Sequence, residues 1–138
     1  MDMQITFEKG LYKLMENEDN IALFREMILK NMDNTEKCKT LIDKLFKFVK
    51  ENNLMSSKAW AYYFLGCYYF DISQFEASAK NFLASYNLFL QMDNKNEIVY
   101  PCDGLTNVYC RMGQFKLANE WGLKGISFCE ETGNKEAM

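Results

Sequence analysis

The chain has 138 residues, of which 49% are apolar and 25% are charged, with a formal net charge of −3. These values fit about one globular domain and exclude wholesale disorder. One proline and seven glycines are too few to end the many strands of an all-β protein. The acidic balance argues against nucleic-acid binding, and no stretch approaches the ~18 apolar residues of a membrane span.

The first predicted elements are two short helices within residues 1–32. Apolar residues recur in them at helical spacing: Phe7, Leu11 and Leu14, then Ile21, Phe24, Met27 and Ile28. These helices show no repeat register. We expect them to cap the exposed apolar face of the helix that follows, as atypical terminal units do in solenoids.

From residue 33 onward the sequence repeats itself with a period of 40 residues. The segment Ser73-Gln74-Phe75-Glu76 matches Gly113-Gln114-Phe115-Lys116, and Asp33-Asn34-Thr35-Glu36 lies one period earlier. A period of this size is typical of stacked helix pairs. We therefore expect a half repeat over 33–53, full repeats over 54–93 and 94–133, and the start of another repeat at 134–138.

Each repeat is expected to contain two helices. Asp33, Ser73 and Gly113 hold equivalent positions, and each suits the N-cap of the helix that follows. Ser73 and Glu76 have the spacing of a capping box, and Asn94 with Glu97 predicts a further cap. After the caps, two apolar stripes are expected to form core: Cys38, Leu41, Ile42, Leu45, Phe46 and Val49, then Phe75, Ala79, Phe82, Leu83, Tyr86, Phe89 and Leu90.

Three further features of the repeats bear on packing and charge. Small residues share helix faces and predict close helix packing; they are Ser78, Ser85, Ala118, Gly122 and Gly125. Lysines between residues 37 and 50 alternate with acidic residues, which predicts a solvated helix face rather than a phosphate-binding track. Pro101 falls inside a predicted helix. Either this helix starts near residue 101, with Tyr100 extended before it, or it kinks there.

The motif Leu65-Gly66-x-x-Tyr69 and the residues that follow it resemble the tetratricopeptide repeat (TPR) family. The matching residues are Phe75, Ser78, Phe82 and Ser85, then Leu105, Tyr109, Gly113, Phe115, Ala118 and Gly125. The second unit departs from the consensus at Thr106 and Gly122. The resemblance implies an all-α fold, namely a right-handed α-solenoid of antiparallel helix pairs with about seven helices.

The resemblance also implies a groove lined by the first helix of each repeat, in which a protein or peptide segment binds. The corresponding residues are Trp60, Tyr63, Cys67, Phe70, Asp71, Tyr100, Asp103, Asn107, Cys110 and Arg111. Aromatic residues there would supply contact area, Asn107 a backbone hydrogen bond and Arg111 a carboxylate partner. The same aromatic residues could instead belong to the core, and the two polar ones to a solvated helix face.

Catalytic chemistry is not expected, because the chain has no histidine and no phosphate-binding or nucleophile-elbow motif. No metal site or cofactor is predicted either, since the five cysteines lack zinc-site spacing. Cysteines within apolar helical stretches favour a reducing, cytoplasmic setting. No basic segment followed by an apolar run opens the chain, so no signal peptide is expected.

Three functional hypotheses remain at this stage. The first is a peptide- or protein-binding regulatory module, similar to the sensory regions placed ahead of output domains in larger bacterial signalling proteins. The second is part of a transcriptional regulator that responds to a peptide pheromone. The third is a self-association module forming a homodimer, because a helix pair left uncovered at residues 134–138 would expose apolar surface to a partner, a second copy or further chain.

Overall fold

The computed structural model describes residues 30–31, 33–52 and 55–133. These residues form five helices, namely α3 (Thr35–Asn52), α4 (Met55–Asp71), α5 (Phe75–Gln91), α6 (Val99–Arg111) and α7 (Phe115–Thr132). The all-α prediction is therefore confirmed. Five helices rather than about seven lie in the described part of the chain. The two helices predicted near the N-terminus and the start of a repeat at 134–138 fall outside it.

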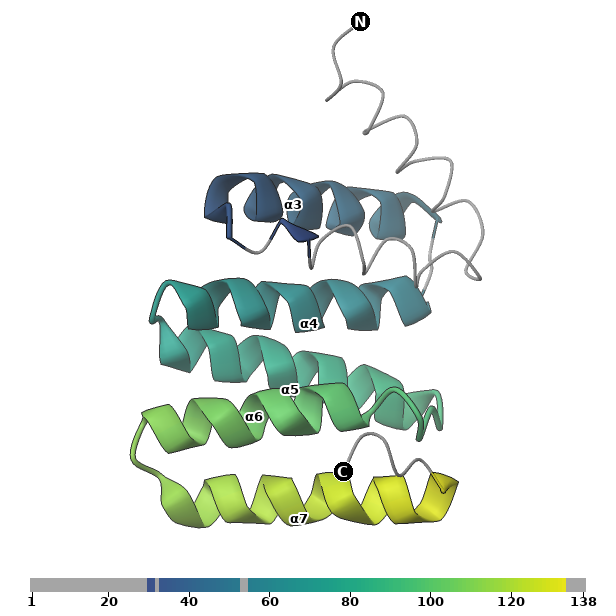
Figure 1. Ribbon diagram of the computed structural model, residues 1–138. Helices are drawn as coiled ribbons and strands as arrows, with labels where there is room; N and C mark the ends of the chain where they lie inside the picture. The colour runs from purple at the N-terminus through teal and green to yellow at the C-terminus, as the bar shows by residue number, and fades with distance from the viewer. Residues whose placement is uncertain (1–29, 32, 53–54, 134–138) are drawn as a thin grey trace, which may run out of the picture.

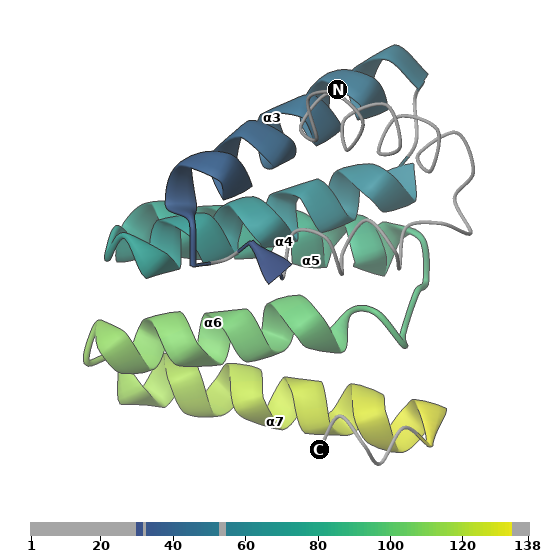
Figure 2. The same cartoon turned by 45° about the horizontal axis from the view of Figure 1, so that its top comes forward.

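The five helices pack in chain order, each antiparallel to the next (Figures 1 and 2). Short turns at residues 72–74 and 112–114 join α4 to α5 and α6 to α7. In addition to these sequential contacts, α4 touches α6. The chain therefore brings α4 and α6 together although α5 separates them in sequence.

The apolar core is centred on α3, α4 and α5. Ile42, Leu45, Phe64 and Phe89 are fully buried there. The predicted stripe on α3 is confirmed, with five of its residues buried and only Phe46 partly exposed. The stripe on α5 is wrong at one position, because Leu90 is 50% exposed. Tyr86 and Phe89, which belong to the same predicted stripe, are buried at this end of α5 as expected.

The helix ends correct two of the predicted N-caps. Ser73 and Gly113 have φ angles of 61° and 74°, in the left-handed region. The Ser73 N–H donates to the Phe70 carbonyl at 3.0 Å, and the next N–H donates to the Tyr69 carbonyl at 2.8 Å. This pattern is a Schellman motif, which ends the preceding helix rather than starting the next. The predicted capping box is absent, since α5 begins after Gln74 with no side-chain cap bond.

Two asparagine side chains accept hydrogen bonds from backbone N–H groups ahead of α3 and α6, and the predicted cap Asp33 is wrong. Asn34, one residue after the predicted cap Asp33, accepts a hydrogen bond from the Lys37 N–H at 3.2 Å. Asn94 accepts one from the Glu97 N–H at 3.2 Å, but this bond lies in the turn before α6. The N-cap of α6 is Ile98 and makes no side-chain cap bond, so the prediction that Asn94 caps this helix is wrong. Both bonds satisfy a backbone donor that has no helical partner.

Pro101 lies in the first turn of α6, which begins at Val99. A proline costs nothing there, because a first-turn N–H has no carbonyl partner within the helix. The helix therefore starts near residue 101, as the first alternative predicted. The expectation that Tyr100 is extended is wrong, since Tyr100 is helical and its N–H donates to the Glu97 carbonyl.

The small residues lie at helix contacts, as predicted. Ser78 and Ser85 are fully buried, and Ala118 is nearly so. A Cβ atom added at Gly125 would lie 3.3 Å from the Cβ of Cys102, so α6 and α7 are close at this point. At Gly122 the nearest atoms to such a Cβ are 3.8 Å away, on Thr106.

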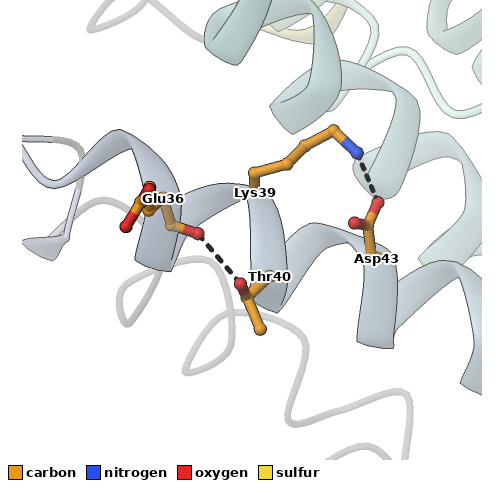
Figure 3. Close-up of polar contacts among 4 residues, drawn as sticks. All are labelled: Glu36, Lys39, Thr40 and Asp43. Atoms are coloured by element: carbon orange, nitrogen blue, oxygen red, sulfur yellow. Dashed lines mark hydrogen bonds and ion pairs between the residues drawn. The ribbon is translucent and has the colours of Figure 1, made fainter.

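The lysine-rich face of α3 carries charges of both signs, as predicted. The Lys39 ammonium lies 2.7 Å from the Asp43 carboxylate one turn later (Figure 3). On the same helix the Thr40 hydroxyl donates to the Glu36 carbonyl at 2.9 Å. Exposed pairs of this kind contribute only about 0.3–0.5 kcal/mol. This face is therefore a solvated surface with little effect on stability.

Candidate functional site

A pocket of about 150 Å³ lies where α4 and α6 meet over α5. It contains six of the ten residues predicted to line the groove: Tyr63, Cys67, Phe70 and Asp71 from α4, and Asp103 and Asn107 from α6. Phe82 of α5 and Gly104 of α6 complete its lining. The structure thus brings together side chains that the sequence separates by more than thirty residues.

The pocket exists because two glycines let α4 and α6 approach the same aromatic ring. A Cβ atom at Gly66 or at Gly104 would lie 2.7 Å from the ring of Phe82, which is closer than real Cβ contacts occur. The Ser78 hydroxyl donates to the Gly66 carbonyl at 2.7 Å and ties α5 to α4 beside this contact. Phe82 is 3% exposed, so its ring is held between the two helices.

Aromatic residues form much of the wall. The ring of Tyr63 lies 5.6 Å from that of Phe82, and the ring of Phe70 lies 5.6 Å from that of Phe75. The Arg111 guanidinium stands over the Phe70 ring, with its central carbon 5.5 Å from the ring centre. This geometry is that of a cation–π contact.

Burial keeps two of the titratable groups in the pocket neutral. It raises the pKa of the Tyr63 phenol far above its usual range, assisted by the neighbouring Cys67. Burial also raises the pKa of the Cys67 thiol to about 12, opposed by a hydrogen bond with Tyr63 and assisted by the charge of Asp71. A thiol that is protonated at neutral pH is a poor nucleophile. The negative charges that line the pocket are those of Asp71 and Asp103.

The charges of the two carboxylates raise the pKa values of groups inside the pocket. The charges of Asp71 and Asp103 each raise the pKa of Cys67, and that of Asp103 also raises the pKa of Tyr63. The pKa of Asp71 is itself raised, because the neighbouring protein removes part of its solvation. The pocket is therefore a small aromatic recess with two acidic groups at its edge.

The other four predicted groove residues lie elsewhere. Trp60 is 1% exposed and packs on Phe89 with ring centres 5.5 Å apart, so the structure places it in the core. Tyr100 is 39% exposed and covers Trp60 beside the pocket. Cys110 faces a separate hollow between α6 and α7. Arg111 ends α6 and reaches the pocket only through Phe70.

Phe82 and Gly104 were not among the residues predicted for the site. Phe82 was assigned to the core, which is correct, but its ring also forms part of the pocket lining. The signal for Gly104 was a glycine inside a predicted helix, which costs about 1 kcal/mol relative to alanine and so indicates a packing reason. In the 40-residue register Thr106 corresponds to Gly66, and Gly104 lies two residues earlier. The repeat therefore did not single out Gly104 as the counterpart of Gly66.

A larger hollow of about 630 Å³ lies at the other end of α4, against α3 and α5. Its described lining combines apolar residues with three lysines: Phe46, Val49, Met55 and Leu88, with Lys47, Lys50 and Lys58. None of the predicted groove residues lies there.

Two absences hold for the described ranges. Within residues 30–31, 33–52 and 55–133, no three His, Cys, Asp or Glu side chains gather into a potential metal site. None of the five described helices combines the length and apolar character that crossing a membrane requires. Comparison of the chain with protein-family models, curated proteins and solved structures gave no match.

Proposed function

We propose that this chain is a non-catalytic, TPR-like module with a regulatory role, which binds a protein or peptide segment in the pocket between α4 and α6. The observation that carries the proposal is the pocket itself, with walls from two helices that hold equivalent places in successive helix pairs. Side chains from two repeats would then contact one ligand, and a recess of this kind is where interface hot spots concentrate.

The repeated geometry supports the solenoid part of the proposal. Helices α4 and α5 form one antiparallel pair, and α6 and α7 form the next. Both pairs turn through the same Schellman motif, at Ser73 and Gly113, which stand one 40-residue period apart. The contact between α4 and α6 joins the first helices of neighbouring pairs. Continued in the same sense, such pairs would build a right-handed superhelix with a concave face along these first helices.

The size of the pocket favours a peptide over a metabolite. Pockets for drug-sized ligands usually enclose roughly 300–1,000 Å³, whereas this one encloses about 150 Å³. A space of that size takes one side chain, while the rest of the ligand lies across the exposed parts of α4 and α6. Asn107 is exposed at the pocket and can offer both a donor and an acceptor to a peptide backbone.

The experiment is a selection of dodecapeptides from a displayed library on the immobilised protein, followed by calorimetric affinities for the enriched sequences. We expect Asn107→Ala to weaken binding by up to about tenfold, because a lost hydrogen bond typically costs about 0.5–1.5 kcal/mol. Asn87→Ala on α5 is the matched control, since Asn87 is also exposed but lies outside the pocket. Failure to enrich any peptide, or equal affinities for both variants, would contradict the proposal.

Self-association is a second candidate, and the surface of α7 favours it. Phe115, Leu123 and Ile126 are 69%, 58% and 42% exposed, beside small residues that leave a shallow hollow along the helix. If copies associate there, sedimentation should show dimers that Leu123→Lys converts to monomers. Leu90→Lys, at a leucine of similar exposure on α5, should have no effect. A monomeric wild type at micromolar concentration would exclude this candidate.

A further inference from the structure

The charges that line the pocket between α4 and α6 are all of one sign. Asp71 at the end of α4 and Asp103 in α6 both line it, and no lysine or arginine does. Within the described part of the chain, neither Asp71 nor Asp103 takes part in an ion pair such as Lys39–Asp43 or Lys95–Glu131. Both carboxylates therefore remain open to a cation supplied by a ligand.

The aromatic part of the pocket suits the same kind of ligand. The π faces of aromatic rings attract ammonium and guanidinium groups within about 6 Å of the ring centre. The protein already uses this attraction at the pocket's edge, where the Arg111 guanidinium stands over Phe70. Tyr63 and Phe82 offer further aromatic surface deeper in the pocket, against which the alkyl stem of a long cationic side chain can pack.

We propose that this pocket binds a lysine or arginine side chain of the peptide segment, with the cation between Asp71 and Asp103 and the alkyl stem against Tyr63 and Phe82. The inference rests on the proposed function and specifies the chemistry of its ligand. An acidic side chain would be repelled by two carboxylates. An apolar side chain would remove water from both carboxylates without replacing the lost interactions.

The test uses n-butylguanidinium as a probe and n-butylurea as its neutral isostere, each titrated at neutral pH. Binding is followed by the backbone amide signals of Cys67, Asp71 and Asp103. The cation should bind with a dissociation constant at least about tenfold lower than that of the urea, because only the cation gains the charged contacts with the two carboxylates. Equal binding of the two probes, or no binding of the cation, would overturn the inference.

Variants separate the pocket from general charge effects. In Asp71→Asn/Asp103→Asn the preference for n-butylguanidinium should disappear. Asp93→Asn, at an exposed aspartate outside the pocket, should retain it. Asn tolerates the left-handed φ of 53° at that position. A preference that persists in the double variant would overturn the inference. The single variant Asp103→Asn should reduce the preference for n-butylguanidinium, and it replaces the double variant in this test if the double variant does not fold.

Peptides enriched in the library selection distinguish this inference from the proposed function. Replacing their lysines by norleucine, or their arginines by citrulline, should weaken binding to the wild type by about tenfold, with little effect on the double variant. If peptides depend on Asn107 but not on a cation, the proposed function holds and the inference fails. If the cation probe binds as expected but no peptide is enriched, the cation pocket stands and the proposed function fails.

Discussion

Replacing Gly104 by alanine should destabilise the protein, although the same change inside a helix usually stabilises it. Glycine in the middle of a helix costs about 0.5–1 kcal/mol relative to alanine, so the substitution gains that amount from the backbone. Against this gain, the new Cβ would lie 2.7 Å from Phe82 ring atoms. Overpacking of a core typically costs about 1–3 kcal/mol.

Helix α4 limits how far the Phe82 ring can move away from α6. Gly66 on α4 holds the same relation to Phe82, with a hypothetical Cβ also 2.7 Å from the ring. Movement of the ring away from α6 therefore presses it against α4. We expect the full overpacking cost to apply and the free energy of unfolding to fall by up to about 2 kcal/mol. For a chain of this size that lowers the Tm by roughly 4 °C for each kcal/mol.

Gly122→Ala is the matched control, because Gly122 also lies inside a helix but its new Cβ meets nothing closer than 3.8 Å. This variant should gain about 0.5–1 kcal/mol. Urea unfolding of both variants, followed by circular dichroism, measures the two changes. In Gly104→Ala/Phe82→Leu, the smaller side chain should remove most of the clash. If Gly104→Ala raises stability as much as Gly122→Ala does, the close approach around Phe82 is refuted.

Three further matched comparisons follow from the structure. The Ser85 hydroxyl is buried without a hydrogen-bond partner in the described chain, while the Ser78 hydroxyl donates to the Gly66 carbonyl. Ser85→Ala should therefore keep or raise the free energy of unfolding, and Ser78→Ala should lower it by about 1 kcal/mol. Urea unfolding of both variants measures these changes. Ser73 and Gly113 both have left-handed φ angles, which a residue without a Cβ adopts most easily. Ser73→Gly should therefore stabilise the protein and Gly113→Ala destabilise it, by about 1 kcal/mol each. Tm shifts of the same sign in the two variants would contradict this. The pKa of the Cys67 thiol is raised to about 12, while Cys110 is exposed. At pH 8 an aromatic disulfide reagent should therefore modify Cys110 first and Cys67 far more slowly, because the thiolate is the reactive form. Equal rates would contradict the raised pKa of Cys67.

The helices and much of the core could be predicted because both depend on local patterns. Apolar spacing located α3 and α5, and it identified Ile42, Leu45 and Phe89 as core residues. Helix ends were harder to predict, because the same residue type can start one helix as its N-cap or end the preceding helix. Ser73 suits an N-cap by composition, yet the chain uses it in the left-handed position that ends α4. That choice depends on hydrogen bonds to carbonyls in the preceding turn, which a propensity scale does not contain.

The pocket was predictable only in part, because it depends on the angle and distance between helices. The resemblance to the TPR family, with the repeat register, implied that Cys67, Asp103 and Asn107 would line one groove, and they line one pocket. The same equivalence could not separate exposed aromatic residues from buried ones, so it assigned Trp60 to the groove although Phe89 and Phe64 enclose it. It also overlooked Gly104, whose role follows from a ring on another helix.

An NMR titration with an enriched peptide would show most directly whether a peptide binds between α4 and α6. Binding in the pocket should concentrate the amide shifts at four of its lining residues, namely Cys67, Asp71, Asp103 and Asn107. Shifts concentrated instead at Leu123 and Ile126 on the exposed face of α7 would contradict it and move the binding surface to that helix.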